Sequence, residues 1–427
     1  MKIGYICSNY PAISHTFVLR EVEALRARGA DVTTFSIHRS GEDQLLSDAE
    51  REAFETTPTI LPPRWGQLLA AHGRALLRSP RAYFSTLAAS VRFGSLAPRR
   101  FLWQVFYFVE AVMLWSESHS KTIRHLHAHQ ANAASDVAML AARLGSEIEP
   151  EQPWSWSFTM HGPTEFFDRR HYRLAEKLED ALFVVCISDF ARSQMMSLSG
   201  PDAWRRLHVV HVGIPVTDFT RKQPPVDGGD QSVLALGRLH PVKGHAVLLE
   251  AIAAMAQDGR RVRLDVAGGG EMQPQLELQA EELGIADLVT FHGAVGQGAL
   301  RDLYEDATIF SLPSFAEGIP VVLMEAMAME VPVVTTRITG IPELVEDEVT
   351  GLLVTPGRPD QVRVAIERLL EGPELRARLG RQGRERVAAE FDVEVSAAQL
   401  YELFSTHLSN PQGGKPRPEA PLPVSPA

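Results

Sequence analysis

Short apolar runs alternate with longer amphipathic segments along most of the chain. The apolar runs are rich in β-branched residues, which is typical of buried strands, and they fall into two series. They comprise residues 2–8, 31–37, 123–129, 155–161, 182–188 and 206–214 in the first series, and residues 232–237, 261–268, 288–293, 307–313, 331–336 and 351–356 in the second. Between them, segments such as 17–29 and 245–259 repeat apolar residues at helical spacing and end in Gly29 and Gly259. The pattern therefore predicts helices between the strands.

This alternation predicts an α/β fold with two doubly wound domains that face a central cleft. Near-continuous apolar strands joined by helices form parallel sheets with both faces covered. The sequence RKQPPVDGGDQ (221–231) separates the two series and has the composition of a linker. We therefore expect domains at 1–220 and 232–392, a closing helix at 393–408 and a disordered, proline-rich tail at 409–427. Ligands should bind at the carboxyl ends of the strands.

One block, residues 56–115, interrupts the alternation. Between Thr56 and Val109 there is no acidic residue, although the whole chain carries a net charge of -11. The arginines of this block are Arg64, Arg74, Arg78, Arg81, Arg92, Arg99 and Arg100. Aromatic residues are interleaved with them, namely Trp65, Tyr83, Phe84, Phe93, Phe101 and Trp103. The block predicts a basic, aromatic helical insertion that binds an anionic membrane surface through residues 64–103; the alternative is an insertion whose arginines are simply solvated.

Composition narrows the class of protein. The 427 residues are 45% hydrophobic and 22% charged, as in soluble globular proteins, and the negative net charge argues against a nucleic-acid partner. We expect a cytoplasmic protein, because the first residues lack the apolar core of a signal peptide. The apolar stretch 101–115 is interrupted by Glu110 and is shorter than the ~20 residues that a spanning helix needs. Cys7 and Cys186 lie in strand-like runs and are expected to be reduced core residues, although a disulfide stays possible.

Two basic residues follow the first strand of the second series. In GRLHPVKG (237–244), Arg238 and Lys243 are five positions apart at the carboxyl end of the strand. An arginine offers a planar fork to phosphate oxygens and a lysine offers a compact charge, so together they suit a diphosphate. The alternative is a surface loop with two solvated bases.

Two glutamates flank a turn in FAEGIPVVLMEAM (315–327). Glu317 follows a predicted strand, Pro320 suits the first turn of a helix, and Glu325 falls inside that helix among apolar residues. A helix amino terminus attracts anionic or hydroxyl oxygens, and a buried carboxylate is costly unless it accepts hydrogen bonds. Ribose and sugar hydroxyls would supply such bonds. Taken alone, the spacing is equally compatible with two ligand-binding glutamates and with a capping glutamate followed by an exposed helical one.

Together, these motifs resemble the retaining family-4 glycosyltransferases of the GT-B fold, which consists of two Rossmann-like domains. The resemblance implies that Arg238 and Lys243 bind the donor diphosphate and that Glu325 binds the ribose. It also implies that Glu317 and His161 contact the transferred sugar at the catalytic centre. Backbone groups of Gly318, Ile319 and Pro320 would contact the sugar as well.

The amino-terminal half resembles the branch of this family that acts in colanic-acid and other exopolysaccharide assembly. The resemblance rests on SNYPAISHTFVLREVEAL and LHAHQANAASDVAMLAARL, and it places Ser14, His15 and Thr16 on the acceptor side of the cleft. Relatives usually carry Glu at the position of His15, which bears on acceptor or sugar preference. They often carry Gly at the position of Glu330, a departure that is expected to be structural.

The implied function is transfer of a hexose from a UDP- or GDP-sugar to a polyprenyl-linked saccharide in exopolysaccharide, capsule or lipopolysaccharide assembly. The enzyme would be cytoplasmic and peripheral at the inner membrane face, with no cofactor and no metal, because two bases and a helix dipole stabilise the leaving diphosphate. Two alternatives stay open: a GT-B sugar-nucleotide epimerase, and a non-catalytic membrane-bound partner subunit. The presence of both bases and both glutamates counts against the partner subunit.

Three other patterns are weaker evidence for a functional site. His125, His127 and His129 alternate on one face of a strand and imitate a metal site, but no cysteine or carboxylate lies nearby in sequence. The glycine-rich AGGGEMQPQL (267–276) lacks the G-x-G-x-x-G spacing of a dinucleotide site. The acidic run from Glu343 to Glu348 is most simply interpreted as a solvated helix end.

Overall fold

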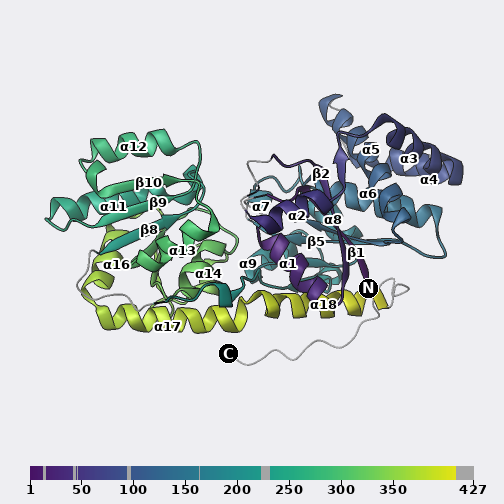
Figure 1. Ribbon diagram of the computed structural model, residues 1–427. Helices are drawn as coiled ribbons and strands as arrows, with labels where there is room; N and C mark the ends of the chain where they lie inside the picture. Colours follow the sequence, from purple (N-terminus) through teal and green to yellow (C-terminus); the bar gives the residue numbers. More distant parts are fainter. Residues whose placement is uncertain are drawn as a thin grey trace.

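The computed structural model consists of two α/β domains side by side, each built around one parallel sheet (Figure 1). It describes residues 1–12, 16–41, 45, 47–93, 98–162, 164–222 and 231–409. The N-terminal sheet contains β1 (Lys2–Asn9), β2 (Asp31–His38), β3 (Thr59–Leu61), β4 (His125–His129), β5 (Ser155–Met160), β6 (Val184–Cys186) and β7 (Leu207–Val209). The C-terminal sheet contains β8 (Ser232–Leu236), β9 (Arg263–Ala267), β10 (Val289–Gly293), β11 (Ile309–Leu312), β12 (Val333–Thr336) and β13 (Leu352–Val354).

Helices alternate with the strands in both domains. Those before β8 are α1 (Thr16–Ala27), α2 (Asp48–Thr56), α3 (Trp65–Arg78), α4 (Pro80–Phe93), α5 (Pro98–Ser120), α6 (Ala133–Ile148), α7 (Thr164–Phe167), α8 (Leu174–Asp180), α9 (Asp189–Met196) and α10 (Pro201–Trp204). Those after β8 are α11 (His245–Gln257), α12 (Gln273–Glu282), α13 (Gln297–Asp306), α14 (Val321–Ala328), α15 (Ile341–Leu344), α16 (Pro359–Glu371), α17 (Pro373–Glu390) and α18 (Val393–Ser409). Short 3-10 turns are η3 (Val216–Asp218), η4 (Pro241–Lys243) and η5 (Ala286–Leu288).

Both sheets are doubly wound, as the sequence predicts. The strand order is β3-β2-β1-β4-β5-β6-β7 in the first sheet and β10-β9-β8-β11-β12-β13 in the second, and all paired strands are parallel. The order reverses between β1 and β4 in one domain and between β8 and β11 in the other. In doubly wound sheets the loops that follow such strands diverge at the reversal, and ligands bind in the crevice between them.

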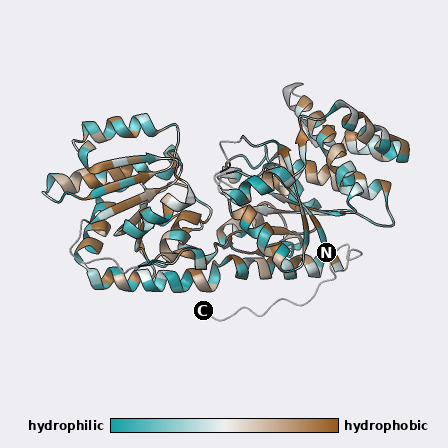
Figure 2. Ribbon diagram, in the orientation of Figure 1, coloured by the Kyte–Doolittle hydropathy of each residue, from teal (hydrophilic) through white to brown (hydrophobic). Residues whose placement is uncertain are grey.

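The core of each domain lies between its sheet and the covering helices. Hydrophobic residues concentrate on the strands and on the inner faces of the helices (Figure 2). Cys7 and Cys186 are both buried and both are free thiols, as expected. Helices α17 and α18 run along the lower edge of both domains (Figure 1). Val393, Ala397 and Phe404 of α18 belong to the same buried cluster as strand β1, so the closing helix returns to the N-terminal domain.

The helical insertion contains α3, α4 and most of α5, which pack against one another at the end of the N-terminal domain that faces away from the C-terminal domain (Figure 1). The sequence pattern predicts that all of residues 56–115 lie outside the sheet. This prediction is wrong for β3, which pairs with β2. A strand of three residues is too short to show an alternating pattern. Among the described residues, every helix is too short or too polar to span a bilayer.

Some sequence predictions concern residues outside the described ranges. These are residues 223–230 of the expected linker, residues 410–427 of the expected tail, and Ser14 and His15. The expected strand at 206–214 is regular only as β7, and Ile214 forms an isolated bridge with Asp392. That bridge joins the end of the N-terminal domain to the turn between α17 and α18.

Candidate functional site

Two loops from separate segments meet where the C-terminal strand order reverses. One loop follows β8 and contains η4, and the other follows β11 and leads into α14. Gly244 has a φ of +71°, and a Cβ there would overlap the carbonyl oxygen of Pro313. The amide of Phe315 donates to the carbonyl of Val242 at 2.7 Å. A close approach that only glycine permits therefore brings the two loops into register.

This approach brings together two of the residues that the motifs predict. The Nζ of Lys243 lies 2.6 Å from Oε1 of Glu317, which also accepts a hydrogen bond from Ser314 Oγ at 2.7 Å. The side chain of Glu317 is only 9% exposed and that of Lys243 is 20% exposed. The lysine ammonium has three donors, so two stay available to oxygens of a ligand in the crevice.

Backbone contacts hold Glu317 in place. Thr339 donates through its hydroxyl to the carbonyl of Glu317, and Thr336 donates to the carbonyl of Ser314 at 2.6 Å. The helix α14 then starts at Val321, with Pro320 as its N-cap residue rather than inside its first turn as the sequence suggested. Because Pro320 has no side-chain oxygen, the first N–H groups of α14 have no side-chain cap.

Arg238 lies on the same loop as Lys243, but its surroundings differ from those of the lysine. It is exposed, and its guanidinium forms no hydrogen bond or ion pair with the rest of the described chain. The glycine-rich segment after β9 packs behind this loop, because Gly268 and Gly270 have positive φ angles and would collide with Gly237 and Leu239 if they carried a Cβ. This loop is therefore braced from behind, and Arg238 projects from it.

The predicted sugar-contacting residue of the N-terminal domain lies against the C-terminal loop. A Cβ at Gly318 would overlap the carbonyl oxygen of His161, so the two backbones are in direct contact across the domain boundary. The ring of His161 lies 4.8 Å from that of Phe17, and its Nε2 lies 2.8 Å from Nδ1 of His129. His161 thus joins the predicted site although 157 positions separate it from Gly318 in sequence.

Glu325 is buried and has partners from both domains. Its Oε1 lies 3.3 Å from a guanidinium nitrogen of Arg20 on α1, and its Oε2 accepts a hydrogen bond from the Tyr304 hydroxyl at 3.3 Å. Burial raises the pKa of the Glu325 carboxyl, while Arg20 and the Tyr304 hydroxyl oppose that rise. No local motif indicates that Arg20 or Tyr304 is a partner of Glu325.

The remaining cleft prediction concerns the start of α1. Thr16 is the first residue of this helix and is partly buried. Phe17, which belongs to the same motif, lies beside His129 and His161. The motif thus reaches the face of the N-terminal domain on which His161 lies.

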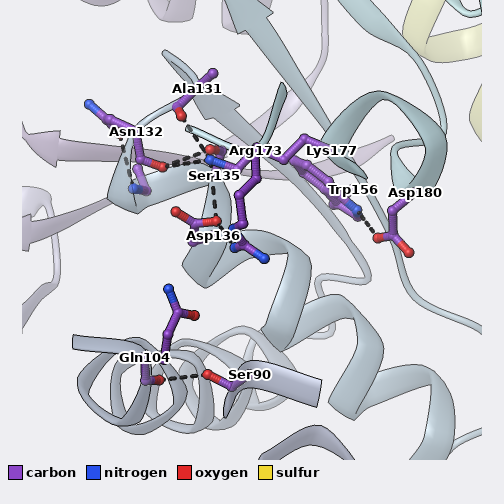
Figure 3. Close-up of polar contacts among 11 residues, drawn as sticks. Ser90, Gln104, Ala131, Asn132, Ser135, Asp136, Trp156, Arg173, Lys177 and Asp180 are labelled. Atoms are coloured by element: carbon purple, nitrogen blue, oxygen red, sulfur yellow. Dashed lines mark hydrogen bonds and ion pairs between the residues drawn. The ribbon is translucent and has the colours of Figure 1, made fainter. Parts of the chain in front are cut away.

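A buried ion cluster supports the loop after β4 (Figure 3). Arg173 and Lys177 both contact the Asp136 carboxylate, and Lys177 also donates to the carbonyl of Ala131 at 2.7 Å. Burial lowers the pKa of Lys177, and Asp136 opposes that change. On the other side of the loop, the Glu165 carboxylate accepts hydrogen bonds from the amides of Ala131 and Gly162. The loop after β4 and the His161 loop are therefore tied together.

The alternating histidines form a hydrogen-bonded ladder with hydroxyl residues of β5. His127 contacts Ser157 through Nδ1 at 2.7 Å and Thr159 through Nε2 at 2.9 Å. Burial lowers the pKa of His127. Glu21, His127 and His129 each offer a potential ligand atom within 4.8 Å of the others. Because both nitrogens of His127 already have partners, an ion there would displace them, and the absence of a metal stays a prediction.

The interpretation of the acidic run as solvated is wrong for Glu343. Its two carboxylate oxygens accept hydrogen bonds from the amides of Asp189 and Phe190 at 2.7 and 2.8 Å, so a C-terminal-domain residue caps the N-terminal-domain helix α9. Carboxylates are favourable at this end of a helix. The glutamate is therefore a contact between domains. Nothing in the local sequence indicates a partner 154 positions away.

Known proteins resemble this chain in sequence and in fold. Residues 216–386 match the model of the family described as glycosyl transferases group 1. A protein of Salmonella typhimurium, named as the colanic acid biosynthesis glycosyltransferase WcaL, is similar to this chain. The two are 31% identical, and the match covers 95% of this chain and 100% of the relative. An alpha-D-kanosaminyltransferase of Streptomyces kanamyceticus is 26% identical over 81% of this chain and 93% of its own.

Solved structures agree on the architecture. The Anabaena protein HepE, solved in complex with UDP, has a TM-score of 0.71 at 18% identity, with 95% of this chain and 100% of that one covered. The same protein has also been solved in complex with UDP-glucose. The likeness confirms the GT-B fold that the sequence motifs implied.

Proposed function

Because the chain belongs to the glycosyl transferase group 1 family, we propose that it is a retaining hexosyltransferase that uses a nucleoside diphosphate sugar. The proposed acceptor is a polyprenyl-linked saccharide in exopolysaccharide assembly, and the proposed location is the cytoplasmic membrane face. Relatives named for colanic acid and amylovoran biosynthesis support the pathway class. HepE, which binds UDP and UDP-glucose, supports the donor class.

The observation that carries the proposal is the contact between Lys243 and Glu317 at the strand-order reversal of the C-terminal sheet. A cation and a carboxylate predicted from separate motifs lie 2.6 Å apart in that crevice. Arg238 projects nearby from the same loop and has no competing partner in the described chain. A diphosphate bound between Arg238 and Lys243 would bring the attached sugar toward Glu317.

In this proposal the charge that develops on the leaving diphosphate is stabilised by Arg238, Lys243 and the uncapped amino terminus of α14. Fixed donors of this kind contribute about 3 kcal/mol each to a transition state. Glu317 and His161 position the transferred sugar, and Glu325 accepts the ribose hydroxyls. The two bases and the helix dipole take the place of a metal ion, so we expect no cofactor. The acceptor oxygen forms its bond to the anomeric carbon on the same face on which the bond to the diphosphate breaks, and the leaving phosphate takes the acceptor proton. The anomeric configuration is therefore retained.

The helical insertion supports a membrane-facing acceptor. Large apolar side chains are exposed on its three mutually packed helices. They are Trp65, Leu69, Leu76, Leu77, Phe84, Phe101, Leu102, Trp103 and Phe106. An exposed cluster of this kind beside exposed arginines suits the interface of an anionic bilayer. Arg78 is less available to bind lipid head groups than the sequence suggested, because its guanidinium contacts His119 and Glu149.

Calorimetric titration with UDP and with GDP, in the presence of a chelator, tests the donor site. We expect one nucleotide to bind without metal and Arg238→Ala to weaken it at least tenfold, since a charge-assisted hydrogen bond contributes about 1.5–3 kcal/mol. Arg301→Ala, at an exposed position of the same domain, is the matched control. Failure of both nucleotides to bind would refute the donor assignment. With a nucleotide sugar and acceptor, NMR of the product's anomeric proton would distinguish retention from inversion.

Flotation with vesicles containing anionic lipid tests the membrane surface. We expect charge reversal at Arg64, Arg81 and Arg92 to release the protein, because each basic residue near such a surface contributes about 1 kcal/mol. The matched control reverses the same number of exposed arginines elsewhere, at Arg205, Arg301 and Arg381. Equal binding of both variants would contradict a specific role for the insertion.

A further inference from the structure

Arg20 reaches from the N-terminal domain to the buried glutamate of the C-terminal domain. It lies on α1, and its guanidinium is 3.3 Å from Oε1 of Glu325 on α14. The side chains are 13% and 6% exposed, so this ion pair is nearly enclosed. The guanidinium also lies 5.7 Å from the ring centroid of Phe219, which is near the end of the N-terminal domain. Arg20 therefore contacts α14 and the segment that leads from one domain to the other.

The carboxylate oxygens can accept further hydrogen bonds. Arg20 approaches Oε1, and the Tyr304 hydroxyl, whose single proton is shared with the carbonyl of Val322 at 3.1 Å, contacts Oε2 at 3.3 Å. A carboxylate has about four lone-pair sites, so these two contacts leave two sites for the two vicinal hydroxyls of a ribose. Without a cation, a carboxylate buried to this degree favours its protonated form. A protonated carboxyl accepts fewer hydrogen bonds than an ionised one.

We propose that Arg20 is a positioning residue for the nucleotide, which holds the Glu325 carboxylate from the opposite domain. It orients the carboxylate and keeps it ionised, so the ribose-binding group is complete only when the two domains are in contact. Nucleotide binding and domain contact thereby favour each other. The inference rests on the proposed role of Glu325 toward ribose, and it gives a role to Arg20, which the motif SNYPAISHTFVLREVEAL contains but to which it assigns none.

Binding of ribonucleotides and 2′,3′-dideoxynucleotides tests this role. UDP, GDP and their dideoxy analogues would be titrated into the wild type, Arg20→Met and Arg20→Lys. We expect Arg20→Met to weaken binding of the ribonucleotide about tenfold and of the dideoxy analogue less than twofold, because only the first can use a carboxylate. Arg20→Lys should recover part of the affinity, because it restores the charge without the fork.

Arg28→Met, in the turn that directly follows α1, is the matched control. Arg28 pairs with Glu394 of α18 at 3.0 Å, and its side chain is half-exposed. Neither ligand should bind differently to this variant, because an exposed pair contributes little. Small-angle scattering of the nucleotide-bound protein gives a second readout, in which Arg20→Met should be more extended than Arg28→Met.

The outcomes separate this inference from the function on which it rests. A wild type that binds neither nucleotide refutes the donor site itself. A wild type that binds both sugar forms equally refutes the ribose role of Glu325. Where the wild type prefers ribose, an equal loss of both ligands in Arg20→Met would refute the positioning role. Unchanged binding would refute it too, and tighter binding would identify Arg20 as a residue that blocks the site.

Discussion

Replacing Lys243 by methionine should destabilise the C-terminal domain even when no ligand is present. The change removes the cation 2.6 Å from Glu317 and keeps a side chain of similar length. Breaking a fully buried pair typically costs about 3–5 kcal/mol, because the remaining charge stays desolvated. Since Lys243 is 20% exposed, water can replace part of its contribution, and we expect a loss of about 2 kcal/mol. In a domain of this size that corresponds to a melting temperature lower by roughly 4–8 °C.

The companion variants divide the effect into charge and packing. Arg238→Met removes a base from the same loop, but this base has no partner in the described chain. Its effect on stability should stay within about 0.5 kcal/mol, as for most surface changes. The double variant Lys243→Met/Glu317→Gln removes the unpaired charge together with its partner. It should therefore be more stable than Lys243→Met alone.

Differential scanning calorimetry of the unliganded proteins provides the measurement, and titration with the nucleotide provides the comparison. Both Lys243→Met and Arg238→Met should lose nucleotide affinity, whereas only the first should lose stability. If Lys243→Met and Arg238→Met had the same melting temperature, the contact with Glu317 would contribute nothing to the stability of the unliganded protein. If the double variant were no more stable than Lys243→Met, the Glu317 carboxylate would not depend on Lys243. Either result would refute the reasoning.

Three further changes test other parts of the structure. Burial and the nearby Asp136 raise the pKa of Glu110 from 4.5 to about 7. The unfolded chain loses this proton at lower pH than the folded one, so the free energy of unfolding falls as the pH rises from 4.5 to 7. The loss is at most about 3 kcal/mol. Glu110→Gln should therefore raise the melting temperature at pH 8 and have little effect at pH 4.5, and equal shifts at both pH values would contradict this. Gly318→Ala should push the backbone of His161 away and reduce transfer activity, while the circular dichroism spectrum stays that of a folded protein. Activity equal to that of the wild type would show that the close contact between the two backbones is dispensable. Glu330 has a φ of +57°, so Glu330→Gly should stabilise the domain by about 1 kcal/mol in urea unfolding, and a loss of stability would mean that its side chain contributes more than its backbone costs.

The sequence predicted those parts of the site that short motifs specify. Lys243 and Glu317 belong to loops that follow β8 and β11, and two adjacent parallel strands bring the ends of such loops to the same edge. Residue type and strand order were therefore sufficient to bring these two side chains to the same edge of the sheet, while their roles toward a ligand stay predictions. The departure at Glu330 was also interpreted correctly as structural, since its left-handed backbone suits glycine.

Contacts between the domains could not be predicted in the same way. Arg20 and Glu343 lie on helices of mixed polarity, where a charged residue is usually solvated. Their partners, Glu325 and the amides of α9, are 305 and about 154 positions away in sequence. Periodicity reports which face of a helix is buried, but it does not report what covers that face. The strand β3 was missed for a related reason, because its pairing with β2 rather than its own pattern defines it.

Helix α1 links the two halves of the candidate site through consecutive residues. Arg20 contacts Glu325 in the C-terminal domain, whereas Glu21 lies 3.3 Å from His129, whose other nitrogen contacts His161. A helix turns about 100° per residue, so neighbouring side chains point in different directions and can serve two partners. A shift of α1 would thus disturb the proposed ribose contact and the proposed sugar contact together. Since the motif SNYPAISHTFVLREVEAL runs into α1 and contains both Arg20 and Glu21, a change of sequence within it can alter both contacts without touching either ligand.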